Sequence, residues 1–196
     1  MSINKVQEYL GLADIDYLAA RLLILNGMPT VGLSKSAEAI EKQFKLFFLM
    51  FEKINNNKEL TTKELKSKGH NLMDMLSSFN LLVPEKMRLG DDWHNYLRLL
   101  QDAYGKRYPE NWDSWEAAIN IDELDDLYVY LRNLNARNLP PELKERGTDF
   151  GTFLGDIWKE ETIIDKIKSN GLKLPMEVLK LNNESFNSLN IKKGKG

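Results

Sequence analysis

The sequence predicts an all-α fold built as a bundle of helices. Over most of the chain, apolar residues recur three and four positions apart, which is the period of an amphipathic helix. No stretch shows the sustained alternation of apolar and polar residues that is typical of a half-buried strand. Hydrophobic residues make up 42% of the 196 positions, which is enough for one domain to bury a core.

The helix expected over residues 34–53 is the centre of this prediction. Its apolar face carries Ala37, Ile40, Phe44, Phe47, Phe48 and Phe51. In its first half Glu38 precedes Lys42 by four residues, the favourable order for an ion pair on a helix, and Glu41 and Lys45 repeat that order. The run LFFLMF that follows is apolar on every side of the helix, so other helices or a second copy of the chain must enclose it.

The N-terminal part of the chain is expected to be helical as well. Residues 2–12 form a short first helix or lead into the next one, for which Asp14 serves as the N-cap. Gly27 stands where this second helix should end. A loop with one proline and one glycine is then expected over residues 28–33.

Further helices are expected before Pro140. Thr61 and Glu64 have the spacing of a capping box, and they start a short basic segment. His70 opens the next helix, and Asp91-Asp92 favours another helix start through capping and the helix dipole. The inward stripes of the three main helices are Leu72, Met75, Leu76 and Phe79; Trp93, Tyr96, Leu97, Leu100 and Tyr104; and Leu124, Leu127, Tyr128, Leu131 and Leu134.

The remaining pattern divides the chain into three parts. Residues 1–140 form the helical bundle, and residues 141–181 form a C-terminal helical extension with its main helix at about 149–170. From residue 182 to 196 the chain is polar and is expected to be a flexible tail. One acidic cluster is interpreted as a solvated face at a helix start: Asp122, Glu123, Asp125 and Asp126.

Composition excludes several classes of site. The chain has no cysteine, so disulfides, thiolate zinc sites and cysteine nucleophiles are excluded, and two histidines are too few for a histidine-rich metal site. The net charge of −2 argues against an extended basic surface for duplex nucleic acid. Neither a signal peptide nor an apolar run of membrane-spanning length is present, so a cytoplasmic protein without a cofactor is expected.

Four sequence fragments occur in the order that a known family shows. They are DYLAARLLILNG at 16–27, AEAIEKQFKLFFL at 37–49, GHNLMDML at 69–76, and Tyr104 followed by RYP at 107–109. Over roughly residues 13–138 the chain resembles the HEPN family, the "higher eukaryotes and prokaryotes nucleotide-binding" domain. The resemblance implies an antiparallel four- to five-helix up-and-down bundle, often a homodimer, that works with a minimal nucleotidyltransferase. It also implies membership of toxin–antitoxin or defence systems, in which some relatives are metal-independent ribonucleases.

The resemblance assigns ligand contacts to Lys42, Lys45, His70, Arg107 and Tyr108. The helix that begins at His70 is expected to fold back beside the first half of the central helix, with the turn at Arg107 closing the same end. So much positive charge in one place implies an anionic ligand, such as a nucleotide phosphate, or neighbouring carboxylates. Glu41 and Asp74 are the candidate carboxylates.

Each of these residues also has a purely structural interpretation. The two lysines can belong to a solvated face with ion pairs to nearby glutamates. His70 can cap its helix and pack its ring. Arg107 can bond helix-end carbonyls, while Pro109 holds Tyr108 in an extended conformation.

The ribonuclease signature of the family matches a second place in the chain. Arg88 is followed by five residues, then His94, and then Tyr96 two positions later. In that chemistry a ribose 2′-hydroxyl attacks the adjacent phosphate, His94 moves the proton, and Arg88 stabilises the charge on the phosphate. Two features depart from the signature: a leucine follows the arginine where the family prefers Asn or Asp, and Asp91-Asp92 adds negative charge between the two residues.

Three functions are therefore compatible with the sequence. The first is a non-catalytic HEPN-like accessory protein that binds a nucleotide or nucleic-acid phosphate beside a nucleotidyltransferase partner. The second is a metal-independent ribonuclease, and the third is an interaction module that only dimerises. Because the LFFLMF run presents apolar side chains in every direction, we also expect a two-fold homodimer.

Overall fold

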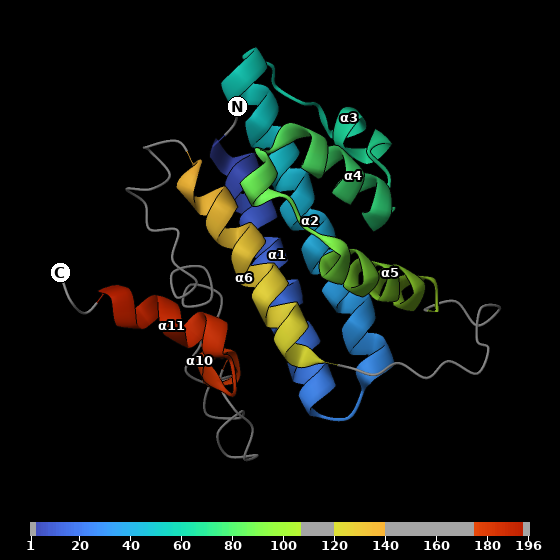
Figure 1. The fold of residues 1–196 in the computed structure, drawn as a ribbon, viewed down its shortest axis with the longest axis vertical. Coiled ribbons are helices and arrows are strands. Elements are labelled where there is room, and N and C mark those ends of the chain that lie inside the picture. Colours follow the sequence, from blue (N-terminus) through green and yellow to red (C-terminus); the bar gives the residue numbers. More distant parts are fainter. Residues whose placement is uncertain (1–2, 107–119, 140–174, 194–196) are drawn as a thin grey trace.

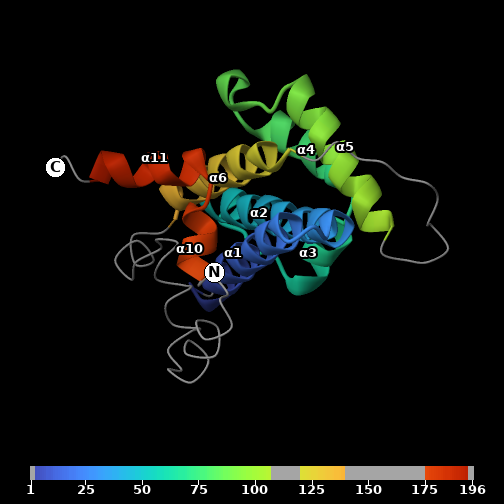
Figure 2. The same cartoon turned by 90° about the horizontal axis from the view of Figure 1, so that it is seen from below.

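The computed structural model describes residues 3–106, 120–139 and 175–193. Within these ranges every regular element is a helix and no strand occurs, which confirms the predicted all-α class. Figure 1 and Figure 2 show α2 (Pro29–Asn56) packed among α1 (Ile3–Leu25), α4 (Leu72–Leu82), α5 (Asp91–Gly105) and α6 (Ile121–Arg137). None of the helices in these ranges is both long enough and apolar enough to cross a membrane.

Helices α1 (Ile3–Leu25) and α2 (Pro29–Asn56) form a long antiparallel hairpin (Figure 1). Gly27, at φ 76°, ends the first helix as predicted, since this left-handed conformation suits glycine. Residues 3–12 lead into the rest of α1 without a break, which is the second of the two alternatives given for them. The loop expected over residues 28–33 is wrong, because α2 begins at Pro29 and proline is well tolerated in the first turn of a helix.

The close approach of α1 and α2 depends on Gly32. A Cβ atom at this position would lie 2.5 Å from Ile24 Cγ1 and 3.1 Å from the Ala20 carbonyl oxygen. Only a residue without a side chain fits at this distance. The hairpin therefore forms at a spacing that places polar side chains of α1 within reach of α2.

The apolar second half of α2 is enclosed within one chain. The buried members of the LFFLMF run are Leu46, Phe47, Phe48, Leu49 and Met50, each at most 6% exposed. Phe79 of α4 (Leu72–Leu82) packs edge-to-face on Phe47, with ring centroids 4.8 Å apart. Neighbouring helices thus cover all of the run except the partly buried Phe51, so the run does not need a second copy of the chain to enclose it.

The helices after α2 begin where the sequence predicted, but the capping expected of Asp91-Asp92 does not occur, because Gly90 is the N-cap of that helix and no side chain caps it. Thr61 and Glu64 form a complete capping box at the start of α3 (Thr62–Ser67). Asn71 is the N-cap of α4, since its side chain accepts hydrogen bonds from the backbone of Met73 and Asp74. After the short 3₁₀ helix η1 (Glu85–Met87), α5 (Asp91–Gly105) buries the stripe that the sequence predicted.

Helix α6 (Ile121–Arg137) lies antiparallel to α1, and the two helices carry the same polar residues at the same spacing (Figure 1). The pattern Asp-x-x-Tyr-x-x-x-Arg is Asp14, Tyr17 and Arg21 in α1 and Asp125, Tyr128 and Arg132 in α6. Positions three and seven residues apart share one helix face. All six side chains are buried, and we call them the Asp-Tyr-Arg network.

The network pairs its six members in antiparallel order. At one end Arg132 donates two hydrogen bonds of 2.8 Å to Asp14. At the other end Arg21 pairs with Asp125. Between them the two tyrosine rings stack, with centroids 4.0 Å apart and planes 9° apart. Each tyrosine hydroxyl donates to the aspartate of the opposite helix at 2.6 Å. The buried charges are therefore both paired and hydrogen-bonded, as a low-dielectric interior requires.

Two sequence-based interpretations are corrected by this network. Asp14 does not cap a helix, because it lies within α1 and binds Arg132. Asp125 does not belong to a solvated acidic face, because it is 2% exposed and binds Arg21. Its neighbours Asp122, Glu123 and Asp126 are exposed, as expected.

The network also reaches α2. The Gln43 side chain donates a hydrogen bond of 3.0 Å to the Tyr128 hydroxyl. Asn135 in turn donates to the backbone and side-chain oxygens of Gln43 at 2.9 and 2.8 Å. α1, α2 and α6 are thus fixed relative to one another by buried hydrogen bonds as well as by apolar packing.

The C-terminal helices α10 (Pro175–Lys180) and α11 (Glu184–Lys193) dock on the same network. The Arg21 guanidinium donates to the backbone carbonyls of Val178 and Leu181, and Asn183 donates to the Tyr17 hydroxyl at 2.8 Å. Phe186 is also buried. The expectation of a flexible tail from residue 182 is therefore wrong for the described part of this segment, because buried polar and apolar contacts hold it. The helix expected at 149–170 lies outside the described residues.

Candidate functional site

Glu41 of α2 brings together two of the predicted ligand-binding residues. Its carboxylate accepts a hydrogen bond of 2.6 Å from the Lys45 ammonium one turn later on the same helix. The His70 Nδ1 atom lies 3.0 and 2.9 Å from the two Glu41 oxygens. His70 therefore lies beside the first half of the central helix, as the sequence-based prediction requires.

The members of this cluster differ in their exposure. The side chains of Lys45 and Glu41 are only 6% and 11% exposed, whereas the His70 side chain is 61% exposed. A buried ion pair thus supports an imidazole that faces solvent. Because a carboxylate only accepts hydrogen bonds, Nδ1 carries the proton in this contact, and Nε2 is the nitrogen available to a ligand.

Aromatic rings flank the cluster. The Tyr104 ring stacks on His70, with centroids 6.2 Å apart and planes 24° apart. This contact places the C-terminal end of α5 next to His70. On the side of α1, burial and then the Glu41 charge raise the pKa of Tyr9, so its phenol stays neutral near pH 7.

Lys42 belongs to a different set of contacts. Its ammonium pairs with Asp16 of α1 and lies 3.9 Å from Glu38. Lys35 binds the same two carboxylates. Lys42 and Lys45 therefore each have a carboxylate partner, as the structural interpretation of these lysines expected, and Lys45 is too buried to meet a ligand directly.

The basic segment before His70 carries lysines that, unlike Lys42 and Lys45, have no described carboxylate partner. Lys63, Lys66 and Lys68 are exposed, and among the described residues none of them has a carboxylate partner. The Lys68 ammonium lies 5.0 Å from the centroid of the Phe48 ring on α2. Since positions 41, 45 and 48 share a face of α2, the chain from Lys68 to His70 runs along that face. Positive charge thus accumulates beside the exposed imidazole.

Arg107 and Tyr108 lie outside the described residues. Lys106 is the last described residue of this segment, two positions after Tyr104.

The ribonuclease signature residues lie just before α5 and in its first two turns. Arg88 is exposed in the turn after η1, and His94 is half-buried in the first turn of α5. Tyr96 is 4% exposed and leaves α5 roughly 200° around the helix from His94, given about 100° per residue. No hydrogen bond or ion pair joins any two of the three in the part of the chain that the structure describes.

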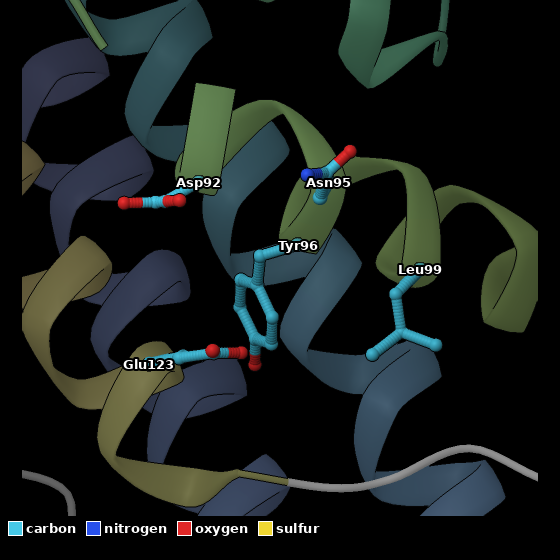
Figure 3. A pocket seen from close by; sticks show the side chains of 5 residues that line it. All are labelled: Asp92, Asn95, Tyr96, Leu99 and Glu123. Carbon is cyan, nitrogen blue, oxygen red and sulfur yellow. The ribbon is translucent and has the colours of Figure 1, made fainter. Parts of the chain in front are cut away.

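Tyr96 instead faces a hollow between α5 and α6 (Figure 3). Its hydroxyl has no hydrogen-bond partner among the described residues. Burial, followed by the charges of Glu123 and Asp125, raises its pKa well above the ordinary value, so the phenol remains protonated. Sequence patterns did not indicate this hollow, because its walls come from residues about 30 positions apart.

Comparisons with known proteins return no match: no family model, no curated protein and no solved structure is similar to this chain. Among the described residues, no group of three or more His, Cys, Asp or Glu side chains is arranged to hold a metal ion.

Proposed function

We propose that this chain is a HEPN-like accessory protein that binds the phosphate of a nucleotide or of a nucleic-acid end at His70. The observation that carries the proposal is the exposed His70 imidazole, which the buried Glu41–Lys45 pair holds through Nδ1. An imidazole fixed at one nitrogen presents the other in a defined direction, as a hydrogen-bond donor when the ring is protonated. That is a suitable contact for a phosphate oxygen.

The surroundings of His70 favour an anion. Lys63, Lys66 and Lys68 add positive charge that no described carboxylate neutralises, although the chain as a whole carries a net charge of −2. The stacked pair of His70 and Tyr104 also offers an aromatic surface, on which a nucleobase can stack. In this arrangement Lys45 positions His70 through Glu41 and does not touch the ligand.

The resemblance supplies the rest of the proposal. A HEPN-like bundle of this kind would work as a homodimer with a nucleotidyltransferase partner in a toxin–antitoxin or defence system. The LFFLMF run is buried except for the partly exposed Phe51, so the argument for a dimer rests on the resemblance and not on this run. Light scattering tests it: twice the chain mass of 22.7 kDa supports the dimer, and 22.7 kDa itself rejects it.

Calorimetric titration of the full chain with ATP tests the binding function. We expect His70→Ala to weaken binding about ten- to hundredfold, because a hydrogen bond to a charged group contributes about 1.5–3 kcal/mol. His94→Ala, which changes the other histidine of the chain, is the matched control and should bind normally. A charge reversal at Lys45 is unsuitable, since it would bury a second carboxylate beside Glu41 and unfold the site.

Two further comparisons define the ligand. A 5′-phosphorylated oligonucleotide should bind more tightly than its 5′-hydroxyl counterpart, and Lys66→Glu with Lys68→Glu should weaken both ATP and oligonucleotide binding. Equal ATP affinity in the wild type, His70→Ala and the lysine variant would reject the proposal. Single-stranded RNA incubated with the protein should remain uncleaved. Cleavage of the RNA that depends on His94 would establish the ribonuclease alternative instead.

A further inference from the structure

A hollow of about 320 Å³ lies between the first three turns of α5 and the first turn of α6. Its described walls are Asp92, Asn95, Tyr96, Leu99 and Glu123. Figure 3 shows the Tyr96 ring reaching from α5 toward α6, with its hydroxyl on the side of Glu123. The hollow is separate from the Glu41–His70 cluster, because it lies toward the N-terminal end of α5, whereas Tyr104, which stacks on His70, lies at the C-terminal end of that helix.

The carboxylates alone have an ordinary structural explanation. Asp92 and Glu123 occupy the first turns of their helices, where negative charge interacts favourably with the helix dipole. The Tyr96 hydroxyl has no such explanation. It belongs to a side chain that is 4% exposed and that lines the hollow, and the hydroxyl itself is buried without a hydrogen-bond partner among the described residues. Buried polar groups in folded proteins are rarely left in this state, so the hydroxyl indicates a missing partner.

We propose that this hollow binds the ammonium or guanidinium group of an organic cation. The two carboxylates and the phenol oxygen are acceptors, and such cations are pure donors. Neither Asp92 nor Glu123 has a cationic partner within the described ranges. Leu99 and the Tyr96 ring supply an apolar wall for the alkyl chain that carries the charge.

The chemistry favours an organic cation over a metal ion. The described walls offer two carboxylates, and no group of three metal-ligating side chains occurs in the described part of the chain. The phenol stays protonated, because burial and the neighbouring acids raise its pKa. The hydroxyl oxygen can then accept a hydrogen bond from the bound cation.

Nuclear magnetic resonance titration of the ¹⁵N-labelled full chain tests the proposal. The probes are n-butylammonium and ethylguanidinium, with the neutral analogues n-butanol and ethylurea as controls. Saturable shifts of the Asn95, Tyr96 and Glu123 amides are expected with the cations only. Glu123→Gln should weaken cation binding at least tenfold, whereas Asp102→Asn, an exposed position at the other end of α5, should leave it unchanged.

Tyr96→Phe removes only the unpartnered hydroxyl. It should weaken cation binding several-fold without lowering the unfolding temperature, because the native fold makes no described hydrogen bond through that atom. The cation can come from a free polyamine or from a basic side chain of a partner protein, and spermidine and a blocked Gly-Arg-Gly tripeptide distinguish these two sources. Tighter binding of spermidine assigns the site to free polyamines. Tighter binding of the tripeptide assigns it to a basic side chain of a partner protein. The absence of saturable shifts with either cation, equal shifts with the neutral analogues, or unaltered affinity in Glu123→Gln would overturn the proposal.

Discussion

Six buried side chains hold the middle of this molecule together, and their energetics differ from those of the apolar core. Charges removed from water are costly, and the attraction between them offsets that cost only when the geometry is good and the remaining hydrogen bonds are made. In the Asp-Tyr-Arg network both conditions are met by the paired arginines and the tyrosine hydroxyls. The network therefore specifies which helices pair. Removal of one charged member would leave its partner charged and unpaired in the core.

Replacement of Arg132 tests this view at a single residue. We expect Arg132→Ala to lower the free energy of unfolding by about 3–5 kcal/mol, because it leaves the Asp14 carboxylate buried and unpaired. Urea denaturation measures the loss. The control is Arg98→Ala, an exposed position on α5, which should stay within about 0.5 kcal/mol of the wild type. Equal effects of the two substitutions would contradict the role of the network.

The buried tyrosines predict a loss of stability in alkali. Burial, reinforced by the neighbouring aspartates, raises the pKa of Tyr17 and Tyr128 well above the ordinary value of 10.0. Above pH 10 the unfolded chain therefore releases protons that the folded chain retains, so unfolding becomes more favourable as pH rises. Each such tyrosine should lower the free energy of unfolding by about 1.4 kcal/mol per pH unit above pH 10.

Denaturation curves collected between pH 9 and 11 measure this slope. Tyr128→Phe should reduce the number of protons released on unfolding by one, which separates this effect from general alkaline damage. A free energy of unfolding that stays constant from pH 10 to 11 would show that these phenols are not held neutral by the fold.

Local sequence patterns could not identify the partners in this network. Asp14 stands where an N-cap is plausible, and its partner Arg132 is 118 residues away. Asp125 lies among other acids and was interpreted with them as solvated. The one pattern that could have indicated these partners is the recurrence of Asp-x-x-Tyr-x-x-x-Arg in two of the expected helices. When two helices with this pattern run antiparallel, the aspartate of each lies opposite the arginine of the other.

At the scale of helices, the start of α4 determines where His70 lies. Asn71 caps α4 by accepting hydrogen bonds from two backbone N–H groups, and His70 directly precedes this cap. The Leu72 backbone N–H also donates to the side chain of Gln101 on α5 at 2.7 Å. The imidazole is therefore attached to a helix end that is held from two sides.

Asn71→Ala tests that attachment. We expect a loss of about 1 kcal/mol in the free energy of unfolding, as for other N-cap replacements, together with weaker ATP binding because His70 is less well oriented. Ser77→Ala is the control on the same helix, since the Ser77 hydroxyl bonds only a carbonyl of the preceding turn. Unchanged stability and unchanged ATP binding in Asn71→Ala would show that the cap does not position the site.

Prediction of the helices succeeded where the signal was local. The capping pair at Thr61 and Glu64, the glycine stop at Gly27 and the stripes of α4, α5 and α6 are all confirmed. Prediction failed where tertiary contacts decided the outcome. The residues around Asn183 look like a polar tail, yet Asn183 is buried against Tyr17 of α1.

Considered as a whole, the described molecule combines a polar layer in its middle with two candidate sites of opposite charge preference. The acidic hollow at Tyr96 is proposed to bind a cation, and His70 is proposed to bind an anion beside lysines that have no carboxylate partner among the described residues. The predicted proximity of His70 to the first half of α2 is confirmed, since a helix beginning there has to pack its apolar stripe on α2. The supporting role of Lys45 could not be predicted, because its burial depends on helices that are distant in sequence.

The central claim is that a phosphate-bearing ligand contacts His70, and the imidazole signals test it most directly. The chain has only two histidines, so long-range ¹H–¹⁵N spectra of their rings resolve His70 with His94 as an internal reference. Titration with ATP should shift the His70 Nε2 resonance in a saturable way and leave the His94 ring unaffected. An unaffected His70 ring at saturating ATP, or a shift confined to His94, would contradict the claim.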